Sequence, residues 1–278
     1  MPELPEVETV RRGLAPVMEG FVFERVTLNR PDLRFPFHPE FVARVQGQKL
    51  EHLTRRAKFM IGELTSGDRI FLHLGMSGRF TIDENVQGQF VHQHDTNPKH
   101  DHVHFVMSSG SRVTYNDPRR FGFMELIAPG EATRIDHLGP EPLSNELSGP
   151  TLRAALKSKK ANIKSALLDQ RVIAGLGNIY VCEALYRAKI SPRRMAGRLK
   201  ITETETLTRH IKDVIAEAIE AGGSSLRDFA NTEGGLGYFQ HTFDVYGREN
   251  EACKICHNPI FRLVQSGRST FYCKICQR

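Results

Sequence analysis

The sequence has no run of about 20 apolar residues, the length that a helix needs to cross a membrane. Its first residues, MPELPEVE, are acidic and rich in proline, the reverse of the basic start of a secretory signal. Cysteine is scarce, and four of the five cysteines lie within the last 26 residues. Because a disulfide framework is usually spread through a small secreted chain, we expect the protein in the cytoplasm.

Acidic residues are nearly missing from two stretches. From Thr151 to Lys200 there are twelve basic residues, opposed only by Asp169 and Glu183, and after Glu251 there are five basic residues and no acidic side chain. The whole chain carries only +6, with a pI near 9.1. Clustered cations attract polyanions, although charge alone would fit a solvated helix face equally well.

The 278 residues, 40% of them hydrophobic, allow two compact domains. Apolar spacing predicts a first helix over Glu6–Leu14, and short apolar runs such as Arg69–Leu74 and Val103–Met107 predict strands of a β-sandwich or barrel. The stretch Leu138–Pro150 holds three prolines and two glycines and is the candidate linker. Helical patterns follow over residues 151–170, 178–188, 202–221 and 224–230. We therefore expect domains at 1–135, 151–246 and 247–278, with a linker at 136–150.

The C-terminal cysteines form two C-x2-C pairs separated by sixteen residues: Cys253, Cys256, Cys273 and Cys276. Four thiolates at this spacing suit tetrahedral zinc, and because they fill every position the ion would be structural. Two disulfides are the less favoured alternative. The alternating His100, His102 and His104 could share one strand face, but nothing nearby favours a second metal.

The segment Ala174–Asn178 lies between two helical patterns. Gly177 can adopt a positive φ there, and Asn178 is of a type preferred at helix N-caps. The free N–H groups at the start of the following helix would attract a phosphate of a nucleic acid. Lys164 on the preceding helix could reach the same nucleic-acid strand. Taken alone, this segment could equally be an ordinary turn that packs two helices together. The zinc motif and the nearby cations together favour DNA binding.

Seven motifs follow one another along nearly the whole chain, and the first of them is highly specific: the opening PELPEVE, Arg55–Lys58 (RRAK), His73–Gly78 (HLGMSG), Lys99–His102 (KHDH), Asp117–Gly122 (DPRRFG), Gly175–Tyr180 (GLGNIY) and Gly267–Cys273 (GRSTFYC). In these motifs the sequence resembles the formamidopyrimidine-DNA glycosylase family. The resemblance implies an α+β protein with an N-terminal antiparallel β-sandwich, a helix–two-turns–helix module and a β-hairpin zinc finger.

The resemblance also implies base excision repair chemistry at the N-terminus. Removal of Met1 would free the secondary amine of Pro2, which would attack C1′ of an oxidised purine nucleotide such as 8-oxoguanine and form a Schiff base. An α-amino group has a pKa of about 7.7–8.0, so a neutral fraction exists at physiological pH. Glu3 would move protons at the sugar, Glu6 would support the site, and β,δ-elimination would cut the strand on both sides. Without the other matches, this segment would read as a capped surface helix.

DNA contacts are implied at further positions. Lys58 and Arg268 would belong to the catalytic residues and would bind phosphates at the lesion. His100, Lys164 and Asn178 would contact the DNA backbone. Met76, Arg119 and Phe121 would fill the gap left by the flipped base, although a buried core role is the ordinary reading of a Met or Phe. The glycine-rich Asn231–Phe239 would cover that base. The expected partner is double-stranded DNA with oxidised bases or abasic sites, bound by a monomer.

Two departures and two rivals accompany this interpretation. The polar Val91–Pro98 resembles a lengthened loop, and a retained Met1 would leave Pro2 as an unreactive amide. The nearer rival is an endonuclease VIII-like glycosylase that prefers oxidised pyrimidines. The other is a non-catalytic zinc-ribbon DNA-binding protein, in which Pro2 and Glu3 merely begin a helix.

Overall fold

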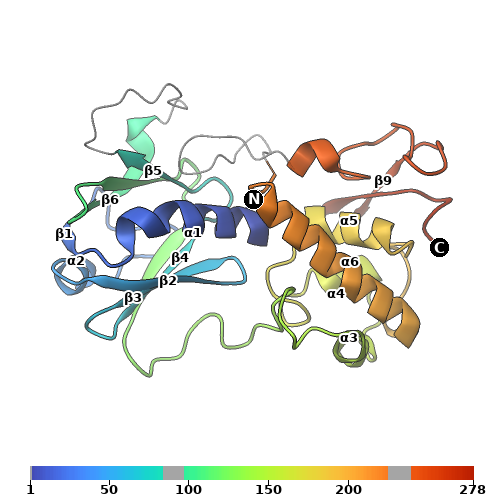
Figure 1. Cartoon of the computed structure of the whole chain (residues 1–278), viewed down its shortest axis with the longest axis horizontal. Helices are drawn as coiled ribbons and strands as arrows, with labels where there is room; N and C mark the ends of the chain where they lie inside the picture. Colours follow the sequence, from blue (N-terminus) through green and yellow to red (C-terminus); the bar gives the residue numbers. More distant parts are fainter. Residues whose placement is uncertain (1, 84–96, 225–238) are drawn as a thin grey trace. The chain divides into compact units, whose positions relative to one another are not determined.

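The computed structural model describes residues 2–83, 97–224 and 239–278 (Figure 1). The chain forms two compact units. One extends to Asp136 and includes the segment that begins at Ala221, and the other comprises His137–Glu220 and Phe239–Arg278. Met1, most of the polar 91–98 segment, residues 225–230 of the expected last helix and most of the glycine-rich 231–239 segment lie outside the described residues.

The first unit opens with helix α1 (Leu4–Met18), which extends the expected Glu6–Leu14 helix at both ends. Pro5 occupies the first turn, where its missing N–H costs nothing. The apolar side chains recur at helical spacing and are buried: Leu4, Val7, Val10, Leu14 and Met18. The helix therefore enters the core along one face and contacts strands of both sheets of this unit.

Those sheets are four-stranded and antiparallel within the described residues. One has the order β2-β3-β4-β8 and the other β1-β6-β7-β5. The strands are β1 (Phe23–Leu28), β2 (Leu50–Arg56), β3 (Phe59–Leu64), β4 (Arg69–His73), β5 (Arg79–Asp83), β6 (Asp101–Met107), β7 (Arg112–Asn116) and β8 (Phe123–Ile127). Side chains from both sheets, from α1 and from α2 (Phe41–Val45) share one core. The expected antiparallel sandwich is confirmed.

The second unit is mainly helical, as expected. Its helices are α3 (Gly149–Leu156), α4 (Ile163–Leu167), α5 (Asn178–Arg187) and α6 (Ile201–Glu220). The continuous helical pattern over 151–170 was wrong, because the chain breaks between α3 and α4. Asn162 Oδ1 accepts a hydrogen bond from the Ser165 N–H and so starts a new helix. No helix of the described residues is long and apolar enough to span a membrane.

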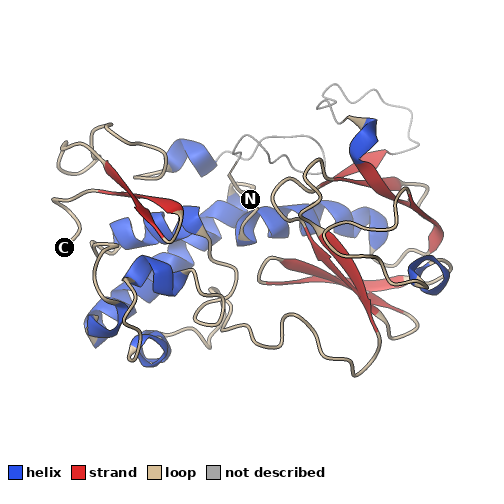
Figure 2. Cartoon of the chain, turned by 180° about the vertical axis from the view of Figure 1, so that it is seen from behind, coloured by secondary structure: helices blue, strands red, loops and turns tan. Residues whose placement is uncertain are grey.

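The C-terminal segment forms an antiparallel hairpin of β9 (Phe261–Gln265) and β10 (Arg268–Tyr272), seen in Figure 2 as a pair of red arrows. Its turn uses positive φ at Ser266 and Gly267. A small core joins the hairpin and the cysteines to α5 through Cys182, Tyr186, Val245, Ile260 and Phe271. The two short 3-10 turns around Ala196–Arg198 and Phe239–Thr242 complete this unit.

Candidate active site and nucleic-acid interface

Pro2 and Glu3 lie immediately before α1, and both are buried. Glu6, one turn into the helix, accepts a hydrogen bond from the Glu3 N–H through Oε2 at 2.8 Å. Its Oε1 accepts from both the N–H and the hydroxyl of Ser224, each at 2.8 Å. Glu6 therefore fastens the backbone that follows Pro2 to the segment beginning at Ala221. Sequence reasoning assigned Glu6 a supporting role but missed Ser224, which lies 218 residues away.

Lys58 follows a strained turn between β2 and β3. Ala57 has φ of 53°, which is unusual for a residue with a side chain. The Arg55 guanidinium donates to the Ala57 carbonyl at 2.9 Å and to Glu8 at 3.2 Å, which fixes this turn. Lys58 is buried. Burial, followed by the positive charges of Lys58 and a neighbouring arginine, lowers the pKa of His73 to about 4, so this imidazole is neutral.

Met76, Arg119 and Phe121 come from two loops of the first unit. The Arg119 guanidinium lies 4.8 Å from the centre of the Phe121 ring, and Phe121 is 44% exposed. The two loops touch through their backbones, because a Cβ at Gly75 would overlap the backbone at Phe121 and Gly122. The structure thus brings together an arginine and an aromatic ring predicted to fill a gap in the base stack.

Of the three alternating histidines, His100 and His102 have ring centres 6.5 Å apart, whereas His104 lies beside Thr114. His100 ends a 3-10 turn and is partly exposed, and its carbonyl accepts a hydrogen bond from the Asp117 N–H. His102 bonds to the Asp117 carbonyl, and His104 bonds to the Thr114 hydroxyl. Within the described part of the chain, the only side chains grouped closely enough to hold a metal ion are the four C-terminal cysteines, so these histidines form no second site there.

Lys164 is completely buried in the second unit. Its ammonium donates to the Thr270 hydroxyl at 2.8 Å, to the Ser269 carbonyl at 3.0 Å and to the Arg268 carbonyl at 3.5 Å. The lysine therefore holds strand β10 and so the backbone of Arg268, whose side chain is exposed. Sequence reasoning placed this ammonium on a phosphate, whereas in this structure it lies beneath the hairpin.

The turn before α5 differs from its prediction in detail. Gly177, not Asn178, is the N-cap, with φ of −134°, and the positive φ belongs to Gly175. Asn178 is the first residue of the helix, and its amide donates to the Ser269 carbonyl at 2.9 Å. Asn178 and Lys164 thus share Ser269, an acceptor that lies about a hundred residues away in the sequence.

The four C-terminal cysteines come together, with all sulfur atoms within 4.8 Å of one another. Cys253 and Cys276 have sulfurs 3.9 Å apart, and Cys256 and Cys273 have theirs 3.4 Å apart. Tetrahedral zinc with thiolates at about 2.3 Å requires sulfur separations of about 3.8 Å. All four are free thiols, so the disulfide alternative is not supported and the donor set fits a metal ion.

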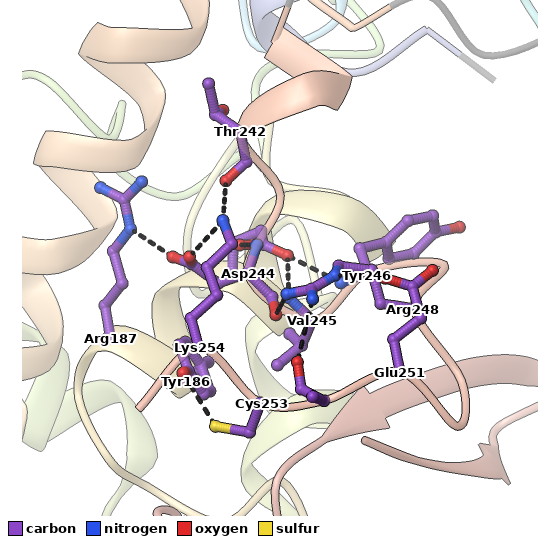
Figure 3. Close-up of polar contacts among 12 residues, drawn as sticks. Tyr186, Arg187, Thr242, Asp244, Val245, Tyr246, Arg248, Glu251, Cys253 and Lys254 are labelled. Carbon is purple, nitrogen blue, oxygen red and sulfur yellow. Dashed lines mark hydrogen bonds and ion pairs between the residues drawn. The ribbon is translucent and has the colours of Figure 1, made fainter. Parts of the chain in front are cut away.

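Side chains of α5 hold the segment that precedes the first cysteine pair and contact Cys253 (Figure 3). Buried Glu183 accepts hydrogen bonds from the N–H groups of Asp244, Val245 and Tyr246 at 2.8–3.0 Å. Burial raises the pKa of Glu183 against the opposing effect of these donors. The Tyr186 hydroxyl lies 3.2 Å from the Cys253 sulfur. The sequence identified Glu183 only as one of two acids in a basic stretch, because its partners follow 61 to 63 residues later.

Comparison with known proteins defines the class. Residues 1–124 match the family model of the formamidopyrimidine-DNA glycosylase N-terminal domain, and residues 138–230 match its helix–two-turns–helix (H2TH) domain. The fold is that of a DNA glycosylase of this family, and its C-terminal hairpin carries the four cysteines.

Relatives match over their full lengths. Formamidopyrimidine-DNA glycosylases of Ruegeria pomeroyi and Bradyrhizobium sp. are 56% and 54% identical, each covering 100% of both chains. The MutM (Fpg) crystal structure from Thermus thermophilus is 37% identical, with a TM-score of 0.86 over 99% of this chain and 98% of that one. The Lactococcus lactis Fpg complex with abasic-site DNA is 31% identical, with a TM-score of 0.87 and full coverage of both. The chain belongs to the formamidopyrimidine-DNA glycosylase family, the DNA glycosylases of base excision repair.

Proposed function

We propose that this glycosylase removes oxidised purines from double-stranded DNA through the N-terminal nitrogen of Pro2, once Met1 has been removed. The observation that carries this proposal is the position of Pro2 and Glu3 just before α1. The Glu6 carboxylate accepts a hydrogen bond from the Glu3 N–H and so fixes the backbone that follows Pro2. A neutral secondary amine has a lone pair for C1′, whereas a lysine, with a pKa near 10.4, would need far larger perturbation.

The reaction is balanced by proton transfers. The proline nitrogen forms a bond to C1′ as the glycosidic bond breaks, and the departing base takes up a proton, for which Glu3 is the nearby acid. The proline nitrogen then loses its own proton, and O4′ takes up a proton that Glu3 can pass on, so that the sugar ring opens and leaves an iminium on the proline. Loss of the C2′ proton then expels the 3′ phosphate, and a second elimination expels the 5′ phosphate. Lys58 and Arg268 are assigned to those phosphates as charge partners.

DNA contacts are proposed on both units. His100 and Asn178 contact the DNA backbone, and Lys164 acts on it through the β10 backbone that its ammonium holds. Met76, Arg119 and Phe121 enter the base stack, where apolar wedges fill the gap and the guanidinium bonds to the orphaned base. The protein is proposed to act as a monomer.

The cysteine cluster is proposed to bind one Zn²⁺ through Cys253, Cys256, Cys273 and Cys276. The sulfur spacing supports this assignment. When bound, the ion supplies folding energy to the hairpin and no open coordination position for catalysis. The residues of the chain then do the rest: the hairpin presents Arg268, and α5 and Lys164 hold the hairpin.

The deciding experiment uses protein whose N-terminus is verified as Pro2. It is mixed with a duplex carrying 8-oxoguanine opposite cytosine, and borohydride is added to reduce any iminium. We expect a covalent adduct mapped to Pro2. Pro5→Ala, which changes the other proline of this segment, should still form it, and full activity in Pro2→Gly would overturn the assignment.

The same experiment separates the rivals. An adduct formed with an oxidised pyrimidine but not with 8-oxoguanine would favour the endonuclease VIII-like specificity. Absence of an adduct with either lesion or with an abasic site would reduce the protein to a zinc-bearing DNA binder. Protein that retains Met1 should form no adduct, because its Pro2 nitrogen is an amide.

A further inference from the structure

Asp117 is completely buried where β7 ends, and its carboxylate is surrounded by donors. Oδ1 accepts from the Ser77 hydroxyl at 2.6 Å and from the Arg119 N–H at 3.3 Å. Oδ2 accepts from the Gly122 N–H at 2.8 Å and from the Tyr115 hydroxyl at 3.3 Å. A carboxylate has about four acceptor positions, so these donors satisfy it completely.

The donors belong to the two loops that carry the proposed wedge. Ser77 follows Met76 on the loop after β4, whereas the Arg119 and Gly122 N–H groups flank Phe121 on the turn before β8. Ser77 also accepts directly from the Arg119 N–H at 3.2 Å. The carboxylate and this hydroxyl therefore bridge two segments that lie about 40 residues apart in the sequence.

Glycines allow the bridge to close. A Cβ at Gly78 or Gly122 would overlap the Tyr115 hydroxyl, and one at Gly75 would overlap the opposite loop. Burial, with the negative charge of Asp117, raises the pKa of Tyr115 well above its ordinary value, so its hydroxyl remains a donor. The loops are packed backbone to backbone around a fully satisfied polar centre, and dense packing of this kind resists independent movement.

We infer that Asp117 and Ser77 are positioning residues that join the two loops into one rigid wedge, so that Met76, Arg119 and Phe121 enter the base stack together. The inference rests on the proposed role of these three side chains. Eviction of the damaged base is then one concerted step, and loosening the bridge slows that step before it affects the chemistry at the sugar.

The test is Ser77→Ala, with Ser109→Ala as the matched control. Ser109 is an exposed serine of the same unit whose hydroxyl bonds to the Val17 carbonyl, away from the wedge. Wedge insertion is followed by stopped-flow fluorescence of 2-aminopurine placed beside the lesion. Single-turnover base excision and cleavage of a preformed abasic site are measured on the same protein, and thermal unfolding checks its fold.

We expect Ser77→Ala to slow both the fluorescence change and base excision by about tenfold, the effect of one strong buried hydrogen bond. Cleavage of the abasic site should stay within about twofold, because no base has to leave the stack. Ser109→Ala should match the unaltered protein in all three. Equal slowing of all three reactions by Ser77→Ala, or an unchanged fluorescence phase, would overturn the inference.

A double-mutant cycle tests the coupling itself. In a rigid wedge, Phe121→Ala should slow insertion less in the Ser77→Ala background than in the unaltered protein. The reason is that Ser77→Ala has already released the loop that carries Phe121 from its fixed position beside the Met76 loop. Strict additivity would mean that the loops act independently. If the unaltered protein forms no borohydride adduct, the proposed function fails. If it does and Ser77→Ala inserts normally, only the bridge fails.

Discussion

The two units hold their proposed DNA-contacting segments with buried charges of opposite sign. In the first, the carboxylates of Glu6 and Asp117 collect N–H and hydroxyl groups from distant loops. In the second, the ammonium of Lys164 collects carbonyls and a hydroxyl from β10. A buried charge survives only when hydrogen bonds satisfy it, so each one specifies a backbone arrangement closely.

The two units differ in whether their DNA-contacting segments need a metal ion in order to be ordered. The first has an extensive apolar core between two sheets, and its loops are fastened by the chain's own side chains. The hairpin of the second has a small core that includes its cysteines. Because a small β-hairpin alone is marginal in water, its order should depend on the metal, whereas the order of the wedge loops should not.

Metal removal should give the largest contrast. Treating the protein with a chelator should release one zinc per chain and lower DNA affinity about a hundredfold, since the Arg268 hairpin loses its folding energy. The unfolding transition of the first unit should remain unchanged. Calorimetry and fluorescence anisotropy measure these effects, and a metal-free protein that bound DNA normally would contradict the contrast.

Lys164→Met should have the next largest effect. It leaves the β10 acceptors unpaired and should lower the free energy of unfolding of the second unit by about 2 kcal/mol. Lys160→Met, an exposed neighbour in the same basic segment, is the control and should change stability little.

Salt titration distinguishes the two roles considered for Lys164. If the lysine acts through the hairpin, Lys164→Met should weaken DNA binding without changing the dependence of log affinity on log salt. A direct phosphate contact would lower that slope by about 0.9. The second outcome would support the direct phosphate contact that the resemblance implies.

The first unit should respond to pH through His73. Its pKa falls to about 4 in the folded state from an ordinary value of about 6.5, so below pH 6.5 the unfolded chain binds a proton that the folded one does not. Stability should therefore be full above about pH 6.5 and fall by up to about 3 kcal/mol toward pH 4.

His73→Asn provides the control for this pH dependence. Because His73 Nδ1 accepts from the Gly75 N–H, asparagine offers a similarly placed acceptor that does not titrate. The variant should lose much of the decline in unfolding temperature between pH 6.5 and 4, while the second unit should behave alike in both proteins. An unaltered decline would show that other groups cause it.

Local sequence patterns predicted the helices and strands well, but not the long-range hydrogen bonds that hold them together. The cysteine spacing located the cysteine cluster, and apolar periodicity located α1, α5 and α6, because both signals lie within a few residues. The α3–α4 break was missed although Asn162, a preferred N-cap, was visible. The burial of Lys164 was not predictable, since its acceptors lie 104 to 106 residues away. Asp117 stood in a matched motif, yet only the structure reveals its link to Ser77.

The smallest effect concerns the hydroxyl of Tyr186, which lies 3.2 Å from the Cys253 sulfur. Once Cys253 binds a metal as a thiolate, this hydroxyl can only donate, and its hydrogen bond should slow dissociation of the sulfur. Tyr186→Phe should therefore release zinc to a chromogenic chelator about fivefold faster, the equivalent of one ordinary hydrogen bond. Tyr272→Phe, which removes a hydroxyl from the residue beside Cys273, is the control. Equal release rates in both variants would place the metal's retention in the cysteines alone and widen the contrast with the first unit, whose loops are held by side-chain hydrogen bonds.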